Sequence, residues 1–330
     1  MINIGSNSIK NIMIGSTQAK KAYLGNILIW EYELPFNQQY FTIESLEDSN
    51  IIKIGKSKSP PNLSLSYSLD GGEIWTDLTI SSGQNIVTIN AGDKLLIKGI
   101  NNRLASAWDN YYRFYANKTF KVYGNAMSLL FGNDFINNTE FKTGTNHNLC
   151  GLFYGTTELT DASNLILPAL TCTNGCYNGM FRGCTNLTAA PQLPAIESAY
   201  ECYSSMFEGC INLEIAPEIN LINMAQNACC RMFCMNRNSK ITTPRMTKGP
   251  ILRVATPVVN CYKDMFKGNG NINEVTCLIT TSGISCTDDW LLNAGNGSGT
   301  FRKSSLKGDW GIGTKGGVPT GWTIEDYVEE

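Results

Sequence analysis

The sequence predicts a mainly β protein built from four consecutive parts. Three observations indicate this: short glycine-ended apolar segments at the N-terminus, a run of alternating strands after them, and a motif of about 26 residues that recurs through the second half. We expect a β-meander over residues 1–35, a β-sandwich over 36–125, a solenoid of stacked coils over 126–290 and a C-terminal cap over 291–330.

The N-terminal part repeats a short pattern every ten residues. Ile2–Gly5, Ile12–Gly15 and Ala22–Gly25 alternate apolar positions and end in glycine, and the apolar run Ile27–Trp30 follows. This pattern predicts short strands joined by tight turns. A sheet of this size buries too little surface to be stable alone. We therefore expect it either to pack on residues 34–125 or to be an anchor that docks on a larger assembly or trimerises.

The next part has short alternating segments bounded by turn residues, which predict an antiparallel β-sandwich. The predicted strands are Tyr40–Glu44, Ile51–Gly55, Leu63–Leu69, Ile86–Asn90, Leu95–Gly99 and Thr119–Tyr123. Ser68–Trp75 also fits the Asp-box hairpin. In that hairpin Asp70 accepts hydrogen bonds from turn amides, Gly72 is left-handed and Trp75 packs beneath the turn. A single copy predicts a hairpin and not a glycosidase.

The second half contains an internal repeat, CYxxMFxGCxNLxxAPxLPA. Its phenylalanines, 153, 181, 207, 233 and 266, are separated by 28, 26, 26 and 33 residues. This period lies in the range of leucine-rich repeats. One repeat cannot bury its apolar face alone, so we expect repeats to stack as coils of an α/β solenoid. CYxxMFxGC would be a short helical turn and NLxxAPxLP the strand.

Equivalent residues of successive repeats lie above one another in a solenoid. The repeated Met and Phe are therefore predicted to form the core. These residues are Phe153, Met180, Phe181, Met206, Phe207, Phe233, Met265 and Phe266. The position after Phe changes charge while its neighbours persist, being Arg182, Glu208 and Lys267. We expect this position to face solvent and these three side chains to form an outward recognition face.

The middle and the ends of the repeat region depart from the regular pattern. Ala228–Arg231 interrupts the CYxx spacing and Lys240–Leu252 is an insertion, which puts the regularity of the third and fourth coils in question. Phe131–Phe135 is predicted to be an N-terminal cap or the joint to the sandwich. Trp310 and Trp322 are predicted to cover the last coil, because terminal coils must be capped.

All 12 cysteines lie in the second part of the chain, from Cys150 onward. Disulfide scaffolds are typical of short secreted domains with a small core, and this chain is not short. The cysteines at shared repeat positions are Cys176, Cys202 and Cys261 at one, and Cys184 and Cys210 at another. We expect mainly free, buried thiols in interior ladders, with disulfides between coils as the alternative.

We expect no catalytic, cofactor or metal site, and therefore a protein that is not an enzyme. The single histidine, His147, lies in a polar stretch that predicts an exposed loop, and CxxC pairs are absent, which argues against a zinc site or a nucleophile–His pair. A polysaccharide depolymerase could use two carboxylates, for which Asp134 and Asp288–Asp289 are the candidates. Neighbouring aspartates in a strand point to opposite faces, so that pair would not converge.

The overall charge and hydropathy argue against two classes of partner. With 26 basic and 28 acidic residues the chain lacks the basic excess of nucleic-acid binders. No apolar run reaches the roughly 18–20 residues needed to insert across a membrane. The N-terminus MINIGSNSIK lacks the basic and apolar regions of a secretory signal peptide. We therefore expect either that a leader has been removed from this sequence, or that the protein reaches an exterior surface by another path, such as assembly into a virus particle.

The recurring motif resembles the BspA-type leucine-rich repeats of bacterial surface proteins. The whole chain is similar to tail- or head-fibre proteins of phages that infect gut Bacteroides, including crAss-like phages. The similarity lies in the order of a YLG…IW leader, a YSLDGGEIW sandwich, an AMSLLFGNDF joint, CYxxMFxGC repeats and a GTFxK…GWTIED ending. It implies a virion protein that binds and has no catalytic residues.

From these features we expect residues 1–35 to dock to other virion proteins, and the repeat region to project outward and bind a host surface glycan or protein. A homo-oligomer is expected, because phage particles are symmetric assemblies. The alternative is a bacterial cell-surface adhesin, which would require a signal peptide or a lipobox. A fibre-borne polysaccharide depolymerase is the less favoured third hypothesis.

Overall fold

The structure, a computed structural model, is mainly β, as predicted. It describes residues 34–60, 62–78, 80, 84–238, 240–281 and 285–329, and six short strands before residue 34. The helices among these residues are the short α1 (Ser128–Phe131) and two 3₁₀ turns, η1 (Phe36–Gln38) and η2 (Gly132–Ile136). The other named elements are β-strands, which are joined by turns and loops.

The first six strands form three separate antiparallel hairpins. The pairs are β1 (Asn3–Ile4) with β2 (Asn7–Ser8), β3 (Met13–Ile14) with β4 (Thr17–Gln18), and β5 (Lys21–Leu24) with β6 (Ile27–Glu31). Short strands spaced ten residues apart are thus confirmed. Among the described strands each pair is a sheet of its own, whereas the predicted β-meander would be one sheet. The predicted turn glycines, Gly5, Gly15 and Gly25, lie outside the described residues.

Two sheets follow, packed face to face. Their strands are β7 (Phe41–Ser45), β8 (Asn50–Lys56), β9 (Leu65–Ser68), β10 (Thr76–Leu78), β11 (Gln84–Ile89), β12 (Lys94–Gly99), β13 (Ala105–Ala107), β14 (Asn110–Ala116) and β15 (Phe120–Asn125). One sheet has the order β10-β9-β12-β7-β15-β16 and the other β11-β8-β14-β13. The rings of Phe41 on β7 and Phe114 on β14 are 5.4 Å apart across the core. All six predicted strands are present, and β10, β13 and β14 are additional.

The Asp-box hairpin between β9 and β10 has its predicted geometry. The Asp70 carboxylate accepts hydrogen bonds from the amides of Glu73 and Ile74, both at 3.0 Å. Gly72 has φ of +96°, and the Trp75 indole donates to its carbonyl at 2.9 Å. These bonds lower the pKa of Asp70, first through the Ile74 amide.

The segment after β15 joins the sandwich to the repeat region. Ile100 forms a bridge with Phe131, and the Tyr40 ring is 4.9 Å from the Phe135 ring, as expected of a joint. The next strand, β16 (Leu159–Ile166), pairs in parallel with β15. One sheet therefore crosses the boundary expected after residue 125, and one apolar core runs through both regions.

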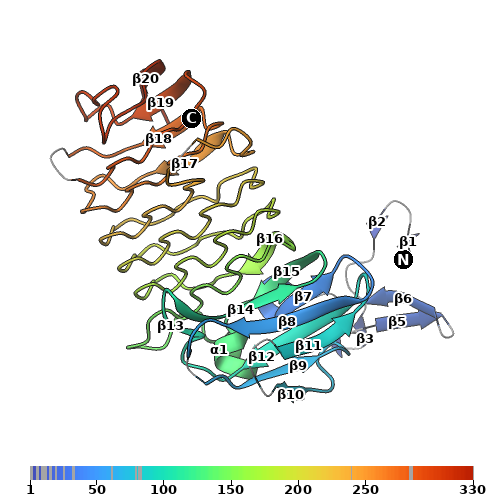
Figure 1. Cartoon of the computed structure of the whole chain (residues 1–330). Coiled ribbons are helices and arrows are strands. Elements are labelled where there is room, and N and C mark those ends of the chain that lie inside the picture. Colours follow the sequence, from blue (N-terminus) through green and yellow to red (C-terminus); the bar gives the residue numbers. More distant parts are fainter. Residues whose placement is uncertain are drawn as a thin grey trace.

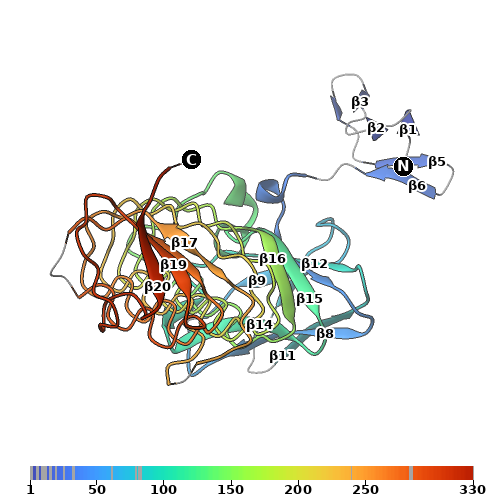
Figure 2. The ribbon, with the colours of Figure 1, turned by 90° about the horizontal axis from the view of Figure 1, so that it is seen from above.

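Beyond β16, successive turns of the chain stack on one another in parallel (Figure 1). Each phenylalanine amide donates to a carbonyl of the next turn: Phe153 to Met180, Phe181 to Met206, Phe207 to Met232, Phe233 to Met265 and Phe266 to Trp290, at 2.8–3.0 Å. We call these turns the first to fifth coil by their phenylalanine, and the turn with Trp290 the sixth. Seen along the stack, the coils lie over one another (Figure 2).

The CYxxMFxGC segments are not helical, so the α part of the α/β prediction is wrong. In the second coil Gly175, Gly179 and Gly183 have φ of +61°, +59° and +76°. A left-handed residue at every fourth position cannot continue a right-handed helix. The chain instead makes consecutive tight turns, in which an amide bonds to the carbonyl three residues earlier, as Met180 does to Tyr177 at 3.1 Å.

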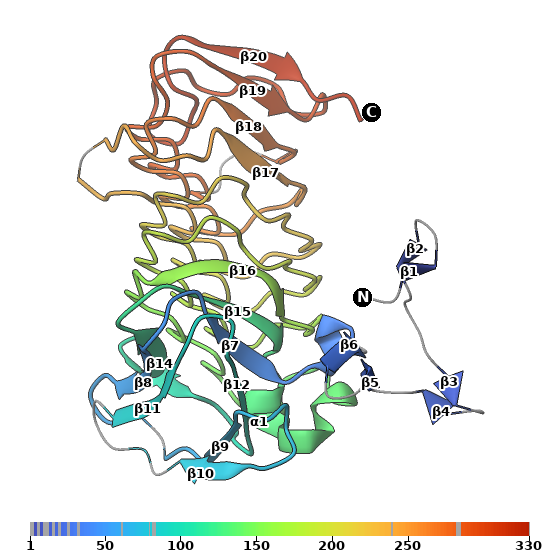
Figure 3. The same ribbon diagram turned by 90° about the vertical axis from the view of Figure 1, so that its right-hand side faces the viewer.

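The strands of the stack gather on one side. A parallel sheet is formed by β17 (Lys248–Leu252), β18 (Glu274–Cys277), β19 (Gly299–Lys303) and β20 (Trp322–Asp326). It lies on the same side as β16 (Figure 3). The predicted cap therefore adds two strands to the stack. Its Trp310 also covers the sixth coil as expected, stacked on Trp290 at 5.5 Å, while Trp322 begins β20.

The predicted core residues are fully buried, and their rings form one column. The ring centres are 5.4 Å apart for Phe153–Phe181 and Phe181–Phe207, 5.6 Å for Phe207–Phe233 and 5.8 Å for Phe233–Phe266. Met180, Met206 and Met265 are 0% exposed beside them. Phe41 at 6.1 Å and Trp290 at 6.4 Å extend the column into the sandwich and the cap.

Ala228–Arg231 keeps the register of the turns, so the question raised over the third and fourth coils is answered there. The Tyr203 amide donates to Ala228, and the Cys229 amide to Cys261. Ala228 thus takes the repeated Cys position and Cys229 the repeated Tyr position. The insertion Lys240–Leu252 contains β17, and it leaves the backbone bonds from Phe233 to Met265 and from Met235 to Lys267 in place.

All twelve cysteines are free and buried, as predicted. The Cys184 and Cys210 thiols occupy equivalent positions and donate to the carbonyls of Phe153 and Phe181 in the preceding coil, both at 3.0 Å. Burial raises the pKa of most of these thiols, to about 12 for Cys150 and Cys277, whereas the hydrogen bond with Cys261 lowers the pKa of Cys286.

Candidate recognition face

The position after the repeated Phe forms a row across the coils, with a different side chain in each. From the first coil to the sixth it holds Tyr154, Arg182, Glu208, Cys234, Lys267 and Leu292. Backbone hydrogen bonds fix this alignment, because the amide that follows each position bonds to the equivalent carbonyl of the next coil, as Gly183 does to Glu208 at 2.7 Å. The predicted residues Arg182, Glu208 and Lys267 therefore share one row.

Glu208 does not face solvent, so that part of the predicted face is wrong. Glu208 is 8% exposed and lies between two arginines. Its carboxylate accepts two hydrogen bonds from Arg237, at 2.8 and 3.0 Å, and pairs with Arg182 at 3.2 Å. The same carboxylate raises the pKa of Arg237, first through the hydrogen bond. The charge that varies from coil to coil is thus neutralised by its neighbours.

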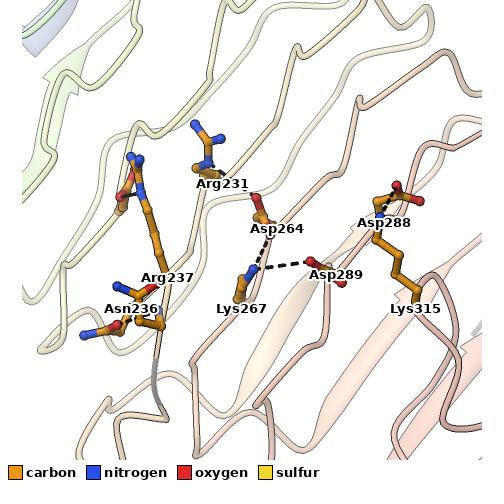
Figure 4. Close-up of polar contacts among 10 residues, drawn as sticks. Arg231, Asn236, Arg237, Asp264, Lys267, Asp288, Asp289 and Lys315 are labelled. Atoms are coloured by element: carbon orange, nitrogen blue, oxygen red, sulfur yellow. Dashed lines mark hydrogen bonds and ion pairs between the residues drawn. The ribbon is translucent and has the colours of Figure 1, made fainter.

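Lys267 is also enclosed by opposite charges. Its amine lies 3.0 Å from Asp264 and 3.4 Å from Asp289 of the next coil, and Asp264 in turn pairs with Arg231 at 3.4 Å (Figure 4). Burial alone would lower the pKa of Lys267, but the hydrogen bond and charge of Asp264 raise it overall. The Lys267 side chain is 14% exposed, and that of Arg182 is 27% exposed.

The sequence did not predict three members of this network: Arg231, Asp264 and Asp289. They occupy the fourth position of CYxx and its equivalents, where φ is +58°, +54° and +55°. The left-handed backbone places these side chains beside the row that follows Phe. These residues could have been found in the sequence as opposite charges one repeat apart, because such residues become neighbours when the coils stack.

The proposed depolymerase carboxylates are not brought together. Asp288 pairs with Lys315 at 3.1 Å, whereas Asp289 pairs with Lys267 (Figure 4). Both lie in a turn of the sixth coil and not in a strand. Asp134 belongs to η2, at the opposite end of the stack (Figure 1). Asp288 and Asp289 thus serve ion pairs between neighbouring turns of the chain.

His147 begins the first coil and is half-buried, so the prediction of an exposed loop histidine is wrong. Its φ is +56°, and its amide donates to Asn174 at 2.8 Å. Burial lowers the pKa of the imidazole. Among the described residues no nucleophile or carboxylate is hydrogen-bonded to the ring, and Nδ1 has no partner.

Metal-binding clusters and membrane-spanning helices were sought in the described part of the chain. It contains no group of three or more His, Cys, Asp or Glu side chains placed to hold a metal ion. Within those same residues there is no helix long and apolar enough to cross a membrane. Comparisons with protein-family models, with curated proteins and with solved structures found no match to this chain.

Proposed function

We propose that this chain is an exposed structural protein of a phage particle, and that residues 126–290 are a BspA-type leucine-rich-repeat solenoid that binds a host surface glycan or protein. One observation carries the proposal. The buried column is nearly invariant from coil to coil, whereas the row beside it changes from Tyr to Arg, Glu, Cys and Lys. Such a stack can vary the side chains that flank its core without changing the core.

The physical basis is that each coil has an inner side that forms the core and an outer side that is open to a partner. Stacked coils bury a continuous core and expose an extended surface, which repeat proteins use for binding. Three groups of ion pairs, around Glu208, around Lys267 and between Asp288 and Lys315, place paired charges of both signs on that surface. A surface of this kind suits a polar partner such as a glycan, which it would meet through hydrogen bonds.

The N-terminal hairpins support a docking role for residues 1–35. Isolated two-stranded hairpins are marginally stable in water and need a neighbour to cover them. We propose that this neighbour is another virion protein, that the chain forms a homo-oligomer there, and that the coils project outward. The proposed location is the exterior of the virion, with a bacterial surface adhesin as the alternative. No catalysis is proposed.

The proposal is tested on purified phage particles. Mass spectrometry should find the chain in the particles, and antibodies against residues 126–330 should label their exterior. The purified full chain should block adsorption of the phage to its host. A chain lacking residues 1–35 should fold and still block adsorption, but should not enter particles.

Two results would contradict the proposal. A chain that is absent from particles but present on the bacterial surface would favour the adhesin. Release of reducing ends from host polysaccharide by the purified chain would favour the depolymerase.

A further inference from the structure

A depression of about 300 Å³ opens where the sandwich meets the first coil, at the Tyr154 end of the row that follows the phenylalanines. Its lining combines aromatic rings with cations and contains no acidic side chain. The lining residues are Gly55, Lys56, Ser57, Tyr111, Arg113, Tyr115 and Tyr154. A volume of this size lies at the lower end of the range for small-ligand sites, which is about 300–1,000 Å³.

Strand alternation on β14 builds one wall of this depression. Tyr112 and Phe114 point into the core, so Tyr111, Arg113 and Tyr115 share the opposite face of the strand. Arg113 pairs in register with Gly55 on β8. A side chain at Gly55 would place its Cβ 2.9 Å from the Tyr115 ring, so the glycine leaves room for that ring.

The first coil supplies the other wall. The Tyr154 ring lies 5.3 Å from the Tyr111 ring, and Arg113 donates a hydrogen bond to the Tyr154 carbonyl at 2.5 Å. A Cβ at Gly151 would lie 2.6 Å from the Tyr111 ring. The close approach of these residues fixes both walls, so the site is preformed from two regions of the chain.

The site is positively charged, and the Arg113 charge is not neutralised by an acidic side chain among the described residues. Arg113 has one hydrogen bond to a carbonyl, and within the described residues it has no carboxylate partner. Its guanidinium lies 5.2 Å from the centre of the Tyr115 ring, and that of Arg182 lies 5.3 Å from the Tyr154 ring. Burial raises the pKa of Tyr111 to about 12, so its hydroxyl stays neutral and can donate a hydrogen bond.

We propose that this depression binds an acidic saccharide, with the apolar face of a sugar ring on the tyrosines and its anionic group on Arg113. Guanidinium forms paired hydrogen bonds to planar carboxylates, and tyrosine offers an apolar face together with a polar hydroxyl. A single-stranded nucleic acid fits less well, because it needs a continuous basic groove, and the chain carries a net charge of −2.

The test uses the purified full chain and isothermal titration calorimetry, and it does not depend on a virion location. Oligogalacturonate, which carries only carboxylates, and a carrageenan oligosaccharide, which carries only sulfates, distinguish a carboxylate from a sulfate as the recognised anion. Methyl-esterified oligogalacturonate is the neutral control. We expect at least one acidic oligosaccharide to bind, and the neutral ester to bind roughly tenfold more weakly or not at all, since charged hydrogen bonds are the stronger ones.

Variants locate the binding. Arg113→Gln should weaken the acidic ligand by roughly tenfold or more, and Arg113→Lys should restore part of the loss because the charge returns without the planar fork. Tyr154→Ala should weaken binding as well. Arg253→Gln, at an exposed arginine of the distant β17 segment, is the matched control and should change nothing. Thermal unfolding shows that each variant is folded.

Three results would overturn the proposal. They are no binding of either acidic oligosaccharide, equal binding of the neutral ester, and unchanged affinity in folded Arg113→Gln. Binding of oligo-dT in the absence of saccharide binding would instead assign the site to nucleic acid. Each of these outcomes leaves the proposed virion role standing, because particles and adsorption are measured separately.

Discussion

The sandwich and the coil stack solve the same packing problem with different backbones. In the sandwich, strand alternation sends every second side chain into the core, and neighbouring strands differ in sequence. In the stack, turns with left-handed residues send the same side chain inward once per repeat, so identical rings meet. The sandwich therefore depends on many unlike contacts, whereas the stack depends on one contact made repeatedly.

Alkaline pH should separate the two regions most strongly. Burial raises the pKa of most of the cysteines, among them Cys176, Cys184 and Cys229, and of Tyr177, Tyr203 and Tyr262. All the cysteines lie outside the sandwich. These acids ionise more readily in the unfolded chain, so stability should fall as the pH rises above about 9. Hydrogen exchange between pH 8 and 11, under reducing conditions, should show the coil amides losing protection before the sandwich amides. Earlier loss in the sandwich would contradict this.

Removing one ring from the column should be the next largest effect. Phe207 stacks on both sides and is 0% exposed. Phe207→Ala should lower the free energy of unfolding by about 3–5 kcal/mol, as expected for a buried aromatic truncation. Phe114→Ala in the sandwich should cost a similar amount. Because the two rings do not touch, the double variant should be additive within roughly 0.5 kcal/mol in urea denaturation. A loss much larger than the sum would mean that the two regions are energetically coupled.

The ion pairs between coils should contribute less, and according to burial. Glu208→Gln removes a buried carboxylate from two arginines and should cost about 1–2 kcal/mol. The matched control is Glu214→Gln, because Glu214 pairs with Arg245 at 2.7 Å while both side chains are more than half exposed. That change should cost about 0–0.5 kcal/mol. Equal effects in chemical denaturation would show that burial does not set the strength of these pairs.

One substitution should have opposite signs in the two regions. Ser205 has φ of +56°, so Ser205→Gly should stabilise the stack by about 1 kcal/mol. Ser66 lies within strand β9, so Ser66→Gly should destabilise by about 0.5–1 kcal/mol. Melting temperatures of the two variants check this. The same sign in both would contradict the left-handed backbone of the turns.

Side-chain periodicity was predictable from the sequence, whereas backbone conformation was not. Alternation located the six sandwich strands, and the repeat located the phenylalanine column. Strand β14 was missed because Tyr111 and Tyr115 make its outer face as aromatic as its inner one. The turns were mistaken for helix because Glu201, Ser205 and Arg231 adopt left-handed conformations, which these residue types rarely do.

The candidate sites depended on contacts that no single segment reveals. A change from Arg182 to Glu208 to Lys267 indicated exposure, yet stacked coils place opposite charges side by side and bury them. The tyrosine and arginine pocket needs Tyr154 of the first coil beside Tyr111 of β14. These two residues are brought together only by the joint between the regions.

The insertion Lys240–Leu252 lengthens the fourth coil without increasing the spacing of the coils in proportion. The fourth coil takes 33 residues to reach the next phenylalanine and the third takes 26. The ring spacing nevertheless changes only from 5.6 to 5.8 Å. Loop length is therefore a free variable for this architecture. A foreign peptide added to this segment would be displayed at the height of the fourth coil, as long as the backbone bonds of Ile241 and Arg245 to the neighbouring coils are kept.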